Sequence, residues 1–190
     1  MSHYTPKELQ NIGFARIGQN VLISRYARIY RPDRIEIGDE TRIDDFCILS
    51  GAVMLGPNVH LAPGTQLAAG AGQITLDDFA GCAFNVVATA SSDDYTGTSL
   101  TNPTVPDTFK SGKIVSDIYV GRHVIIGAGT ILLPGAKLAE GAAVGALSLV
   151  KGKIEPWTIY AGNPLRKIGV RRQGLLKLEA NYLQEDNKDV

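Results

Sequence analysis

The chain has no net charge, no long apolar run and very few cysteines. Its 190 residues include 19 basic and 19 acidic side chains, so we expect no strong electrostatic attraction to nucleic acid. The first residues lack the basic-then-apolar pattern of a signal peptide, and the longest apolar runs, such as residues 142–150, are too short to span a bilayer. Both cysteines, Cys47 and Cys82, fall at or near buried positions of the repeat described next, so we expect small buried side chains. These absences favour one cytoplasmic domain.

The main positive signal is an internal repeat of six residues between Val120 and Glu155. An aliphatic residue opens each unit, and a small or β-branched residue follows four places later. A helix would need apolar residues three and four apart, and an uninterrupted strand would alternate by two. A fixed period with a glycine-rich corner in each unit predicts a solenoid, in which three short sides close one triangular coil. The openers are Val120, Ile126, Leu132, Leu138, Val144 and Val150.

The same register covers much of the N-terminal half, with two slips at corners, and predicts three stacked columns of buried side chains. For these columns to align, residues 91–118 must leave the coil as one loop, and their proline- and serine-containing composition fits that. The first column is Ile37, Leu55, Leu76, Val120 and Leu138. The second is Ile43, Leu61, Cys82, Ile126 and Val144. The third is Leu49, Leu67, Ala88, Leu132 and Val150.

Two segments outside the repeat are predicted to be helical. Thr5 and Pro6 can begin a short helix in an N-terminal cap, which an open solenoid end needs because it exposes core and strand edges. A second helix is predicted from Gln173 to about Gln184, with an apolar stripe that we expect to cover the C-terminal end of the solenoid. The predicted parts are a cap at 1–16, a solenoid at 17–156 with an extruded loop at about 91–118, and a C-terminal segment with its helix at 157–190.

The repeat resembles the hexapeptide pattern of left-handed β-helix acyltransferases: an aliphatic residue, then Gly, Ala, Glu or Asp, two free positions and a small residue. Residues 161–167 (AGNPLRK) are similar to the closing segment of that family, with Leu165 where alanine is usual. The resemblance covers roughly residues 17–172 and is closest in pattern to surface-polysaccharide sugar acetyltransferases such as perosamine N-acetyltransferases. It implies an all-β solenoid, a left-handed parallel β-helix with a short cap, one long extruded loop and a C-terminal α-helix. It also implies a homotrimer with active sites between subunits.

The resemblance implies acetyl-CoA as the acyl donor. Backbone amides at corners rich in glycine and alanine suit the amide-bearing pantetheine arm, although these residues also serve the tight corners themselves. A basic cluster near the C-terminus lies where the family binds the nucleotide end of CoA, although such a cluster is otherwise a solvated face. The expected cofactor-binding residues are Gly127, Ala128, Gly145, Ala146, Lys151, Asn163, Pro164, Arg166 and Lys167.

Acyl transfer from a thioester also needs a base for the acceptor and donors for the oxyanion. Galactoside and maltose acetyltransferases carry their catalytic histidine where the loop leaves the coil, but residues 89–95 (TASSDDY) contain none. We therefore expect His60 to be the base and Asp94 its partner, with His123 as an alternative base and a structural role as the alternative for His60. Another possibility is an amine acceptor that is only positioned by an aspartate. The expected substrate-binding residues are Asp93, Tyr95 and Asn85, with backbone amides near Gly81 or Gly127 as oxyanion donors.

These features together predict an acetyl-CoA-dependent acetyltransferase that acts directly on a sugar. The leading acceptor is the amino group of a nucleotide-linked amino sugar in O-antigen or other surface polysaccharide biosynthesis, and the alternative is a sugar hydroxyl. A non-catalytic hexapeptide scaffold would bind no CoA and would tolerate loss of His60. A γ-type carbonic anhydrase shares the fold but needs three histidines on a zinc ion, two of them close in sequence. His3, His60 and His123 do not have that spacing, so no metal is expected.

Overall fold

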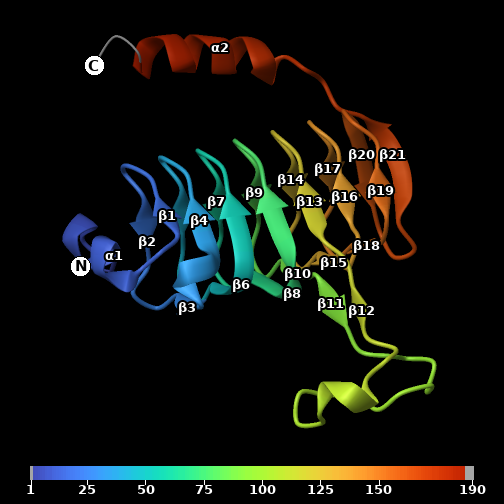
Figure 1. The fold of residues 1–190 in the computed structure, drawn as a ribbon. Helices are drawn as coiled ribbons and strands as arrows, with labels where there is room; N and C mark the ends of the chain where they lie inside the picture. Colours follow the sequence, from blue (N-terminus) through green and yellow to red (C-terminus); the bar gives the residue numbers. More distant parts are fainter. Residues whose placement is uncertain (1, 187–190) are drawn as a thin grey trace.

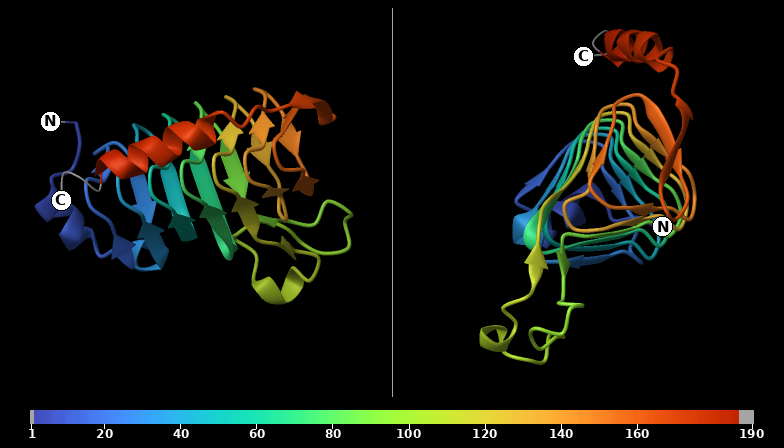
Figure 2. Two further views of the ribbon diagram at one scale, coloured as in Figure 1. Left: turned by 90° about the horizontal axis from the view of Figure 1, so that it is seen from above. Right: turned by 90° about the vertical axis from the view of Figure 1, so that its right-hand side faces the viewer.

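The chain forms a left-handed parallel β-helix of about seven turns in the computed structural model, which describes residues 2–186. Seen along its axis, the coil is a triangle with three flat faces (Figure 2). Strands in successive coils pair in parallel and run across the solenoid axis, and they form an 11-stranded sheet over two of the faces and an 8-stranded sheet over the third (Figure 1). The two ends of the chain leave this triangle, as does one internal loop.

Each face is built from one short strand per coil. Face 1 consists of β1 (Arg16–Ile17), β4 (Ile35–Ile37), the second part of β6 (Ile48–Leu55) and of β8 (Gln66–Leu76), β13 (Ile118–Val120), β16 (Lys137–Leu138) and β19 (Lys153–Ile154). Face 2 consists of β2 (Leu22–Ile23), β5 (Arg42–Ile43), β7 (His60–Leu61), β9 (Gly81–Cys82), β14 (Ile125–Ile126), β17 (Ala143–Val144) and β20 (Thr158–Ala161), with β21 (Arg166–Val170) added antiparallel. Face 3 consists of β3 (Arg28–Tyr30), the first part of β6 and of β8, β10 (Val87–Thr89), β15 (Ile131–Leu132) and β18 (Leu149–Val150).

The strand register confirms the three predicted columns of core residues. On face 2, for example, Ile43 is opposite Leu61, which is opposite Cys82, and Ile126 and Val144 continue the column. All of these side chains are buried, and each buried aliphatic side chain contributes roughly 1.5–3 kcal/mol of transfer free energy. The two cysteines are buried free thiols, and burial raises the pKa of Cys47 to about 11 and that of Cys82 to about 12.

The open N-terminal end is covered by the predicted cap helix, α1 (Pro6–Ile12). Thr5 precedes it as the N-cap and forms a capping box with Glu8, in which each side chain binds the other residue's backbone N–H. Leu9 of α1 is buried against the first coil. The short 3-10 helix η1 (Pro32–Arg34) forms a corner between β3 and β4.

Corner 1, which joins face 1 to face 2, holds one left-handed residue in almost every coil. Glycine, asparagine, aspartate and histidine tolerate positive φ best, so the bulky Phe79 and Trp157 are unusual there. Such backbone strain persists only where surrounding contacts stabilise it. The left-handed residues of corner 1 are Asn20, Glu40, Asn58, Phe79, His123, Gly141 and Trp157, with φ between 52° and 68°.

Helix α2 (Leu175–Asp186) lies along corner 1, so the prediction that it covers the C-terminal end of the solenoid is wrong. It begins after Gly174, two residues later than predicted, because glycine is a poor helix former. From the last coil it runs lengthwise over the corner toward the N-terminal coils (Figures 1 and 2). Polar side chains of the helix find partners at that corner. Neither α1 nor α2, the two α-helices in residues 2–186, has the length and apolarity needed to cross a membrane.

Glu179 and Tyr182 make the principal contacts of α2 with the solenoid. We call the helix together with these contacts the α2 strap. Glu179 binds Arg122 through one carboxylate oxygen and His123 Nε2 through the other, at 3.0 Å for the histidine. The His123 ring stacks on Phe79, with ring centroids 5.1 Å apart. Tyr182 meets Phe79 edge-on and donates a hydrogen bond to Asn58 Oδ1 at 3.1 Å. The strap therefore ties the end of the chain to three different coils.

The predicted extruded loop is confirmed between β10 and β13. It leaves corner 3, which joins face 3 back to face 1, through an antiparallel pair, β11 (Ser91–Ser92) and β12 (Ile114–Val115). It projects well away from the solenoid and contains the short helix η2 (Asp107–Phe109) (Figure 1). The loop and the α2 strap thus occupy different corners of the triangle (Figure 2).

Candidate functional site

The structure gathers the backbone candidates for CoA binding at one place, corner 2, which joins face 2 to face 3. Gly127 and Ala128 form this corner in one coil, and Gly145 and Ala146 form it in the next. The third coil of the series places residues 161–163 beside them, because Tyr160 is opposite Val144 in the register. The result is a column formed mostly of small residues in three adjacent coils.

Gly127 is needed for these coils to approach one another. A Cβ atom at residue 127 would lie 2.4 Å from the backbone nitrogen of Ala146 and 2.7 Å from the carbonyl carbon of Gly145. The Gly127 N–H donates to Val144 O at 2.7 Å, and Ala128 O accepts from Leu147 N at 2.8 Å. The absence of a side chain at residue 127 therefore allows this close contact between coils.

We expect Gly127→Ala to lower the free energy of unfolding by about 2 kcal/mol or more, because the new methyl group would push two backbones apart. Gly81→Ala is the matched control: Gly81 also lies on face 2, but a Cβ atom there meets nothing within 4 Å, so its effect should stay below about 1 kcal/mol. Urea unfolding followed by circular dichroism measures both. Equal midpoints for the two variants would contradict this account of the corner.

The predicted cations are only partly gathered near corner 2. Arg166 lies opposite Ala161 in the register and is exposed, beside the small-residue column. Lys167 is engaged by Glu155 at 2.7 Å, and Lys151 lies at corner 3, on the other side of face 3. Pro164 follows a cis peptide bond at the turn between β20 and β21. Arg166 is therefore the cation best placed to meet a ligand along the column.

A further cation of the basic cluster, Arg171, has a structural role. Its Nη1 donates to the backbone oxygens of His123 at 2.5 Å and Gly141 at 3.1 Å, so it closes the chain against corner 1. Burial lowers the pKa of this guanidinium. Arg171 therefore anchors the start of the α2 strap and is not free for phosphate.

Asp94 organises the extruded loop. Its two carboxylate oxygens accept hydrogen bonds from the backbone and hydroxyl groups of Thr96 and Thr98, and from the Ser99 N–H at 2.9 Å. The hydrogen bond from the Thr96 hydroxyl is the largest of several causes that hold the pKa of Asp94 well below its usual range. The lowered pKa means that the carboxylate keeps its charge, and the loop keeps these bonds, until strongly acidic pH.

The three predicted substrate-binding residues lie at two different corners of the chain. Asp93 lies beside Asp94, and its Oδ2 accepts from the Asn102 N–H at 2.9 Å. Tyr95, in the same loop, is 93% exposed. Asn85 is exposed at corner 2, in a left-handed conformation with φ of 57°. Within one chain, loop and column are therefore separated by face 3.

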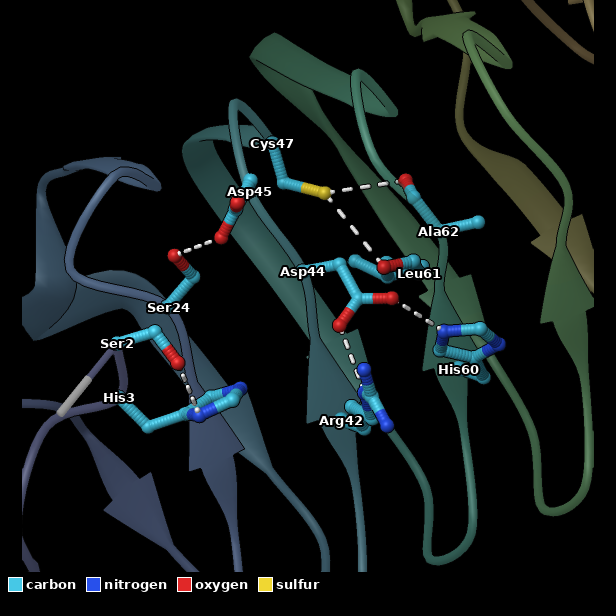
Figure 3. Close-up of polar contacts among 10 residues, drawn as sticks. All are labelled: Ser2, His3, Ser24, Arg42, Asp44, Asp45, Cys47, His60, Leu61 and Ala62. Carbon is cyan, nitrogen blue, oxygen red and sulfur yellow. Dashed lines mark hydrogen bonds and ion pairs between the residues drawn. The ribbon is translucent and has the colours of Figure 1, made fainter.

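His60 does not meet Asp94 within the chain, and its partner is Asp44. His60 points outward from β7 on face 2, and its side chain is half exposed. Its Nε2 is 2.8 Å from Asp44 Oδ2, and Arg42 Nε donates to Asp44 Oδ1 at 2.6 Å (Figure 3). This Arg42–Asp44–His60 cluster spans two adjacent coils.

The alternative base, His123, is buried beneath α2. Its side chain is 7% exposed, and its Nε2 faces Glu179. A residue enclosed by a helix, Phe79 and Trp157 cannot reach a substrate. Among residues 2–186, no group of three or more His, Cys, Asp or Glu side chains could hold a metal ion.

Sequence reasoning missed Asp44 and Glu179, the two carboxylates that pair with histidines. Asp44 follows a core residue in the position where the hexapeptide pattern allows any small or acidic residue, so its type carried no special signal. The spacing of one coil between Asp44 and His60 is the signal that could have been used, because β5 and β7 are register neighbours. Glu179 could not have been paired with His123 without knowing the course of α2.

Comparison with known proteins identifies the family. No family model matches the chain. It is 38% identical to the dTDP-4-amino-4,6-dideoxy-D-glucose acyltransferase of Escherichia coli over 96% of this chain and 95% of that protein. AntD, an N-acyltransferase from Bacillus cereus solved with dTDP and 3-hydroxybutyryl-CoA, is 43% identical, with a TM-score of 0.94 over 98% of each chain. A maltose O-acetyltransferase from Clostridium difficile 630, at 18% identity, shares the fold with a TM-score of 0.60 over 88% of this chain and 75% of that one. The chain therefore belongs to the hexapeptide-repeat acyltransferases.

Proposed function

We propose that this acyltransferase moves the acyl group of an acyl-CoA to the amino group of a dTDP-linked 4-amino-4,6-dideoxy sugar. The observation that carries the proposal is near full-length similarity to an Escherichia coli enzyme of that specificity and to AntD, which was solved with dTDP and an acyl-CoA. The column of small residues at corner 2 supports it, because residues without long side chains let the pantetheine arm lie close to the coils. The acyl group we expect is acetyl.

The chemistry needs one proton acceptor and one oxyanion site. The amine nitrogen attacks the thioester carbon, the C–N bond forms, and the C–S bond breaks as CoA leaves as its thiolate. The proton lost by nitrogen passes to the base and then to the CoA sulfur. We assign the base to His60 and the oxyanion donors to backbone N–H groups near Gly81 or Gly127.

We assign Asp94 to loop organisation, since six hydrogen bonds from three neighbouring residues already occupy its carboxylate. Asp93 has one oxygen engaged by a backbone N–H, which leaves the other for a ligand. Asp93 and Tyr95 would therefore present the loop's polar contacts to the acceptor, and Asn85 would do so from corner 2. Gly127, Ala128, Gly145, Ala146, Asn163 and Pro164, with the cations Arg166, Lys167 and Lys151, remain the proposed CoA-binding set.

We propose a homotrimer with active sites between subunits. The candidate residues of one chain lie at corners 2 and 3, so a second copy is needed to bring a loop against a small-residue column. Exposed apolar side chains at corner 2 and on its flanking faces support such a contact, since a monomer rarely leaves so many in one region. They are Tyr26, Phe46, Phe84, Ile125, Ile131 and Leu147. A nucleotide-activated acceptor would place the enzyme in cytoplasmic synthesis of lipopolysaccharide or a related surface polysaccharide.

Thiol release from acetyl-CoA tests the proposal. We expect turnover with dTDP-4-amino-4,6-dideoxyglucose, and little or none with dTDP-6-deoxyglucose, which has a hydroxyl in place of the amine. The free amino sugar should be a poor acceptor because it lacks the nucleotide. 3-Hydroxybutyryl-CoA is included as a second donor. Turnover with the hydroxyl sugar alone would favour O-acetylation, and absence of both turnover and CoA binding would favour a scaffold.

A further inference from the structure

Residues 2–186 contain two histidine–carboxylate pairs, and they differ in accessibility. His123 and Glu179 are both more than nine-tenths buried under α2. In the other pair, Asp44 has a side chain that is 11% exposed, whereas that of His60 is 50% exposed. Only the second pair combines a sheltered carboxylate with an imidazole that solvent or substrate can reach. That combination is typical of a positioned acid–base group.

The hydrogen bond determines which nitrogen of His60 is available. When the ring is neutral and Nε2 donates its proton to Asp44 Oδ2, Nδ1 carries the lone pair. No atom of residues 2–186 makes a hydrogen bond to His60 Nδ1. The carboxylate thus fixes both the tautomer and the orientation of the ring, and Nδ1 is left as the acceptor at the surface.

Asp44 is itself held in place by several contacts. Its backbone N–H donates to Leu61 O at 3.0 Å, and Arg42 Nε binds its second oxygen at 2.6 Å. The Cys47 thiol lies nearby in the core and donates to Ala62 O at 3.3 Å (Figure 3). Burial raises the pKa of Asp44, but hydrogen bonds from His60 and Arg42 outweigh it and lower the pKa overall. Asp44 is therefore a carboxylate at neutral pH, and Cys47 is a neutral thiol.

The coil that follows leaves room beside the imidazole. Gly81 is the register neighbour of His60 on β9, and a Cβ atom at that position would meet nothing within 4 Å. On the other side, Arg42 is the register neighbour of His60 on β5. The charged and titratable side chains that face the pair are thus Arg42 and Cys47 from the β5 coil, with none from residue 81.

We infer that Asp44 is the positioning residue for His60 in the acyl transfer reaction. The inference rests on the proposed function and on the assignment of His60 as its base. As the amine nitrogen forms its bond to the thioester carbon, His60 Nδ1 takes the proton from nitrogen, and Asp44 stabilises the imidazolium through Nε2. When the C–S bond breaks, the same proton passes from Nδ1 to the CoA sulfur. Asp44 gains and loses no proton, so the cycle returns the pair to its starting state.

The test compares Asp44→Asn with wild-type protein in two independent measurements. The first is the pH profile of kcat/KM for CoA release, and the second is the ¹⁵N NMR spectrum of the His60 ring, assigned by its absence in His60→Gln. Asparagine keeps the size of the side chain but loses the charge and can turn its NH₂ group toward the ring. Asp45→Asn is the matched control, because the neighbouring carboxylate binds Ser24 and not His60.

We expect Asp44→Asn to lower kcat on the order of 10²-fold, to move the rising limb of the pH profile, and to release the ring from its single Nε2–H tautomer. Asp45→Asn should change none of these. In the double variant with His60→Gln, the Asp44 substitution should have little further effect on kcat, because the two residues act as a unit.

An unchanged His60 tautomer together with an unchanged pH profile in Asp44→Asn would overturn the inference while leaving the proposed function intact. If the wild-type protein transfers acyl groups and His60→Gln is as active as wild type, the base assignment fails and the role of Asp44 fails with it. If the wild type releases no CoA with any acceptor, the proposed function fails. The NMR measurement then still shows whether Asp44 sets the tautomer.

Discussion

Replacing His60 by alanine is expected to lower kcat for acyl transfer by on the order of 10²-fold or more, while the affinity for acyl-CoA stays close to that of the wild type. The physical reason is that the variant loses the group proposed to accept the proton of the attacking amine. The small-residue column proposed to bind CoA lies at corner 2 in other coils, so donor binding should not depend on this side chain. Thiol release measures kcat, and calorimetric titration with CoA measures binding.

His3→Ala is the control for this experiment. His3 lies in the N-terminal segment, where it pairs with Ser24 as an isolated β-bridge, and no part of the proposed site uses it. His60 is half exposed, so its removal should leave the fold and the unfolding midpoint nearly unchanged. A His60→Ala variant with nearly intact turnover would assign this histidine a structural role and turn attention to Asp93 in the extruded loop.

Replacing Glu179 by alanine is expected to release the α2 strap and to lower the free energy of unfolding by about 3 kcal/mol. The substitution leaves Arg122 and His123 without their shared carboxylate at a site where His123 is almost fully buried. Tyr182 keeps its hydrogen bond to Asn58 and its edge-on contact with Phe79, but these contacts do not replace the carboxylate lost beneath the helix. Urea unfolding measures the loss of stability. Limited trypsin digestion after Arg172 shows whether residues 171–174, which connect β21 to α2, have become accessible.

Lys177→Ala tests whether any change in α2 has the same effect. Lys177 is exposed on the same helix, and alanine is at least as good a helix former, so we expect a change within about 0.5 kcal/mol. Stability equal to the wild type in Glu179→Ala, together with unchanged resistance to trypsin, would show that the ion pair does not hold the helix.

The solenoid could be predicted in detail because its signal is local and repeated. Each coil places an aliphatic side chain in the same column, so a register error in one unit would have shifted the units after it. The observed columns match the predicted ones. The extruded loop followed from the same arithmetic. Contacts between segments that share no period were not predictable in this way. The course of α2 depends on Glu179 meeting Arg122, 57 residues away in sequence.

The candidate site likewise has features that the repeat predicted and features that it did not. The small residues of corner 2 were identified because they belong to the repeat, and the structure brings them together. The contact between His60 and Asp44 was not predicted, because the acidic pair at residues 93–94 is conspicuous in the sequence whereas Asp44 looks like an ordinary corner residue. This contact depends on the direction of a side chain across one coil, which the pattern of residue types does not encode.

The α2 strap changes how this solenoid should come apart. In a stack of coils, each coil contacts only its neighbours, so the ends can fray without disturbing the middle. Arg171, after the last strand, anchors the start of the strap to His123. Tyr182, near the end of the strap, binds Asn58 far along the axis, so the strap connects the C-terminal coils to central ones. Opening the last coil therefore also breaks contacts made by central coils. A molecule that would otherwise unfold as a series of weakly coupled steps is given a long-range link, which raises the cost of partial opening toward that of global unfolding.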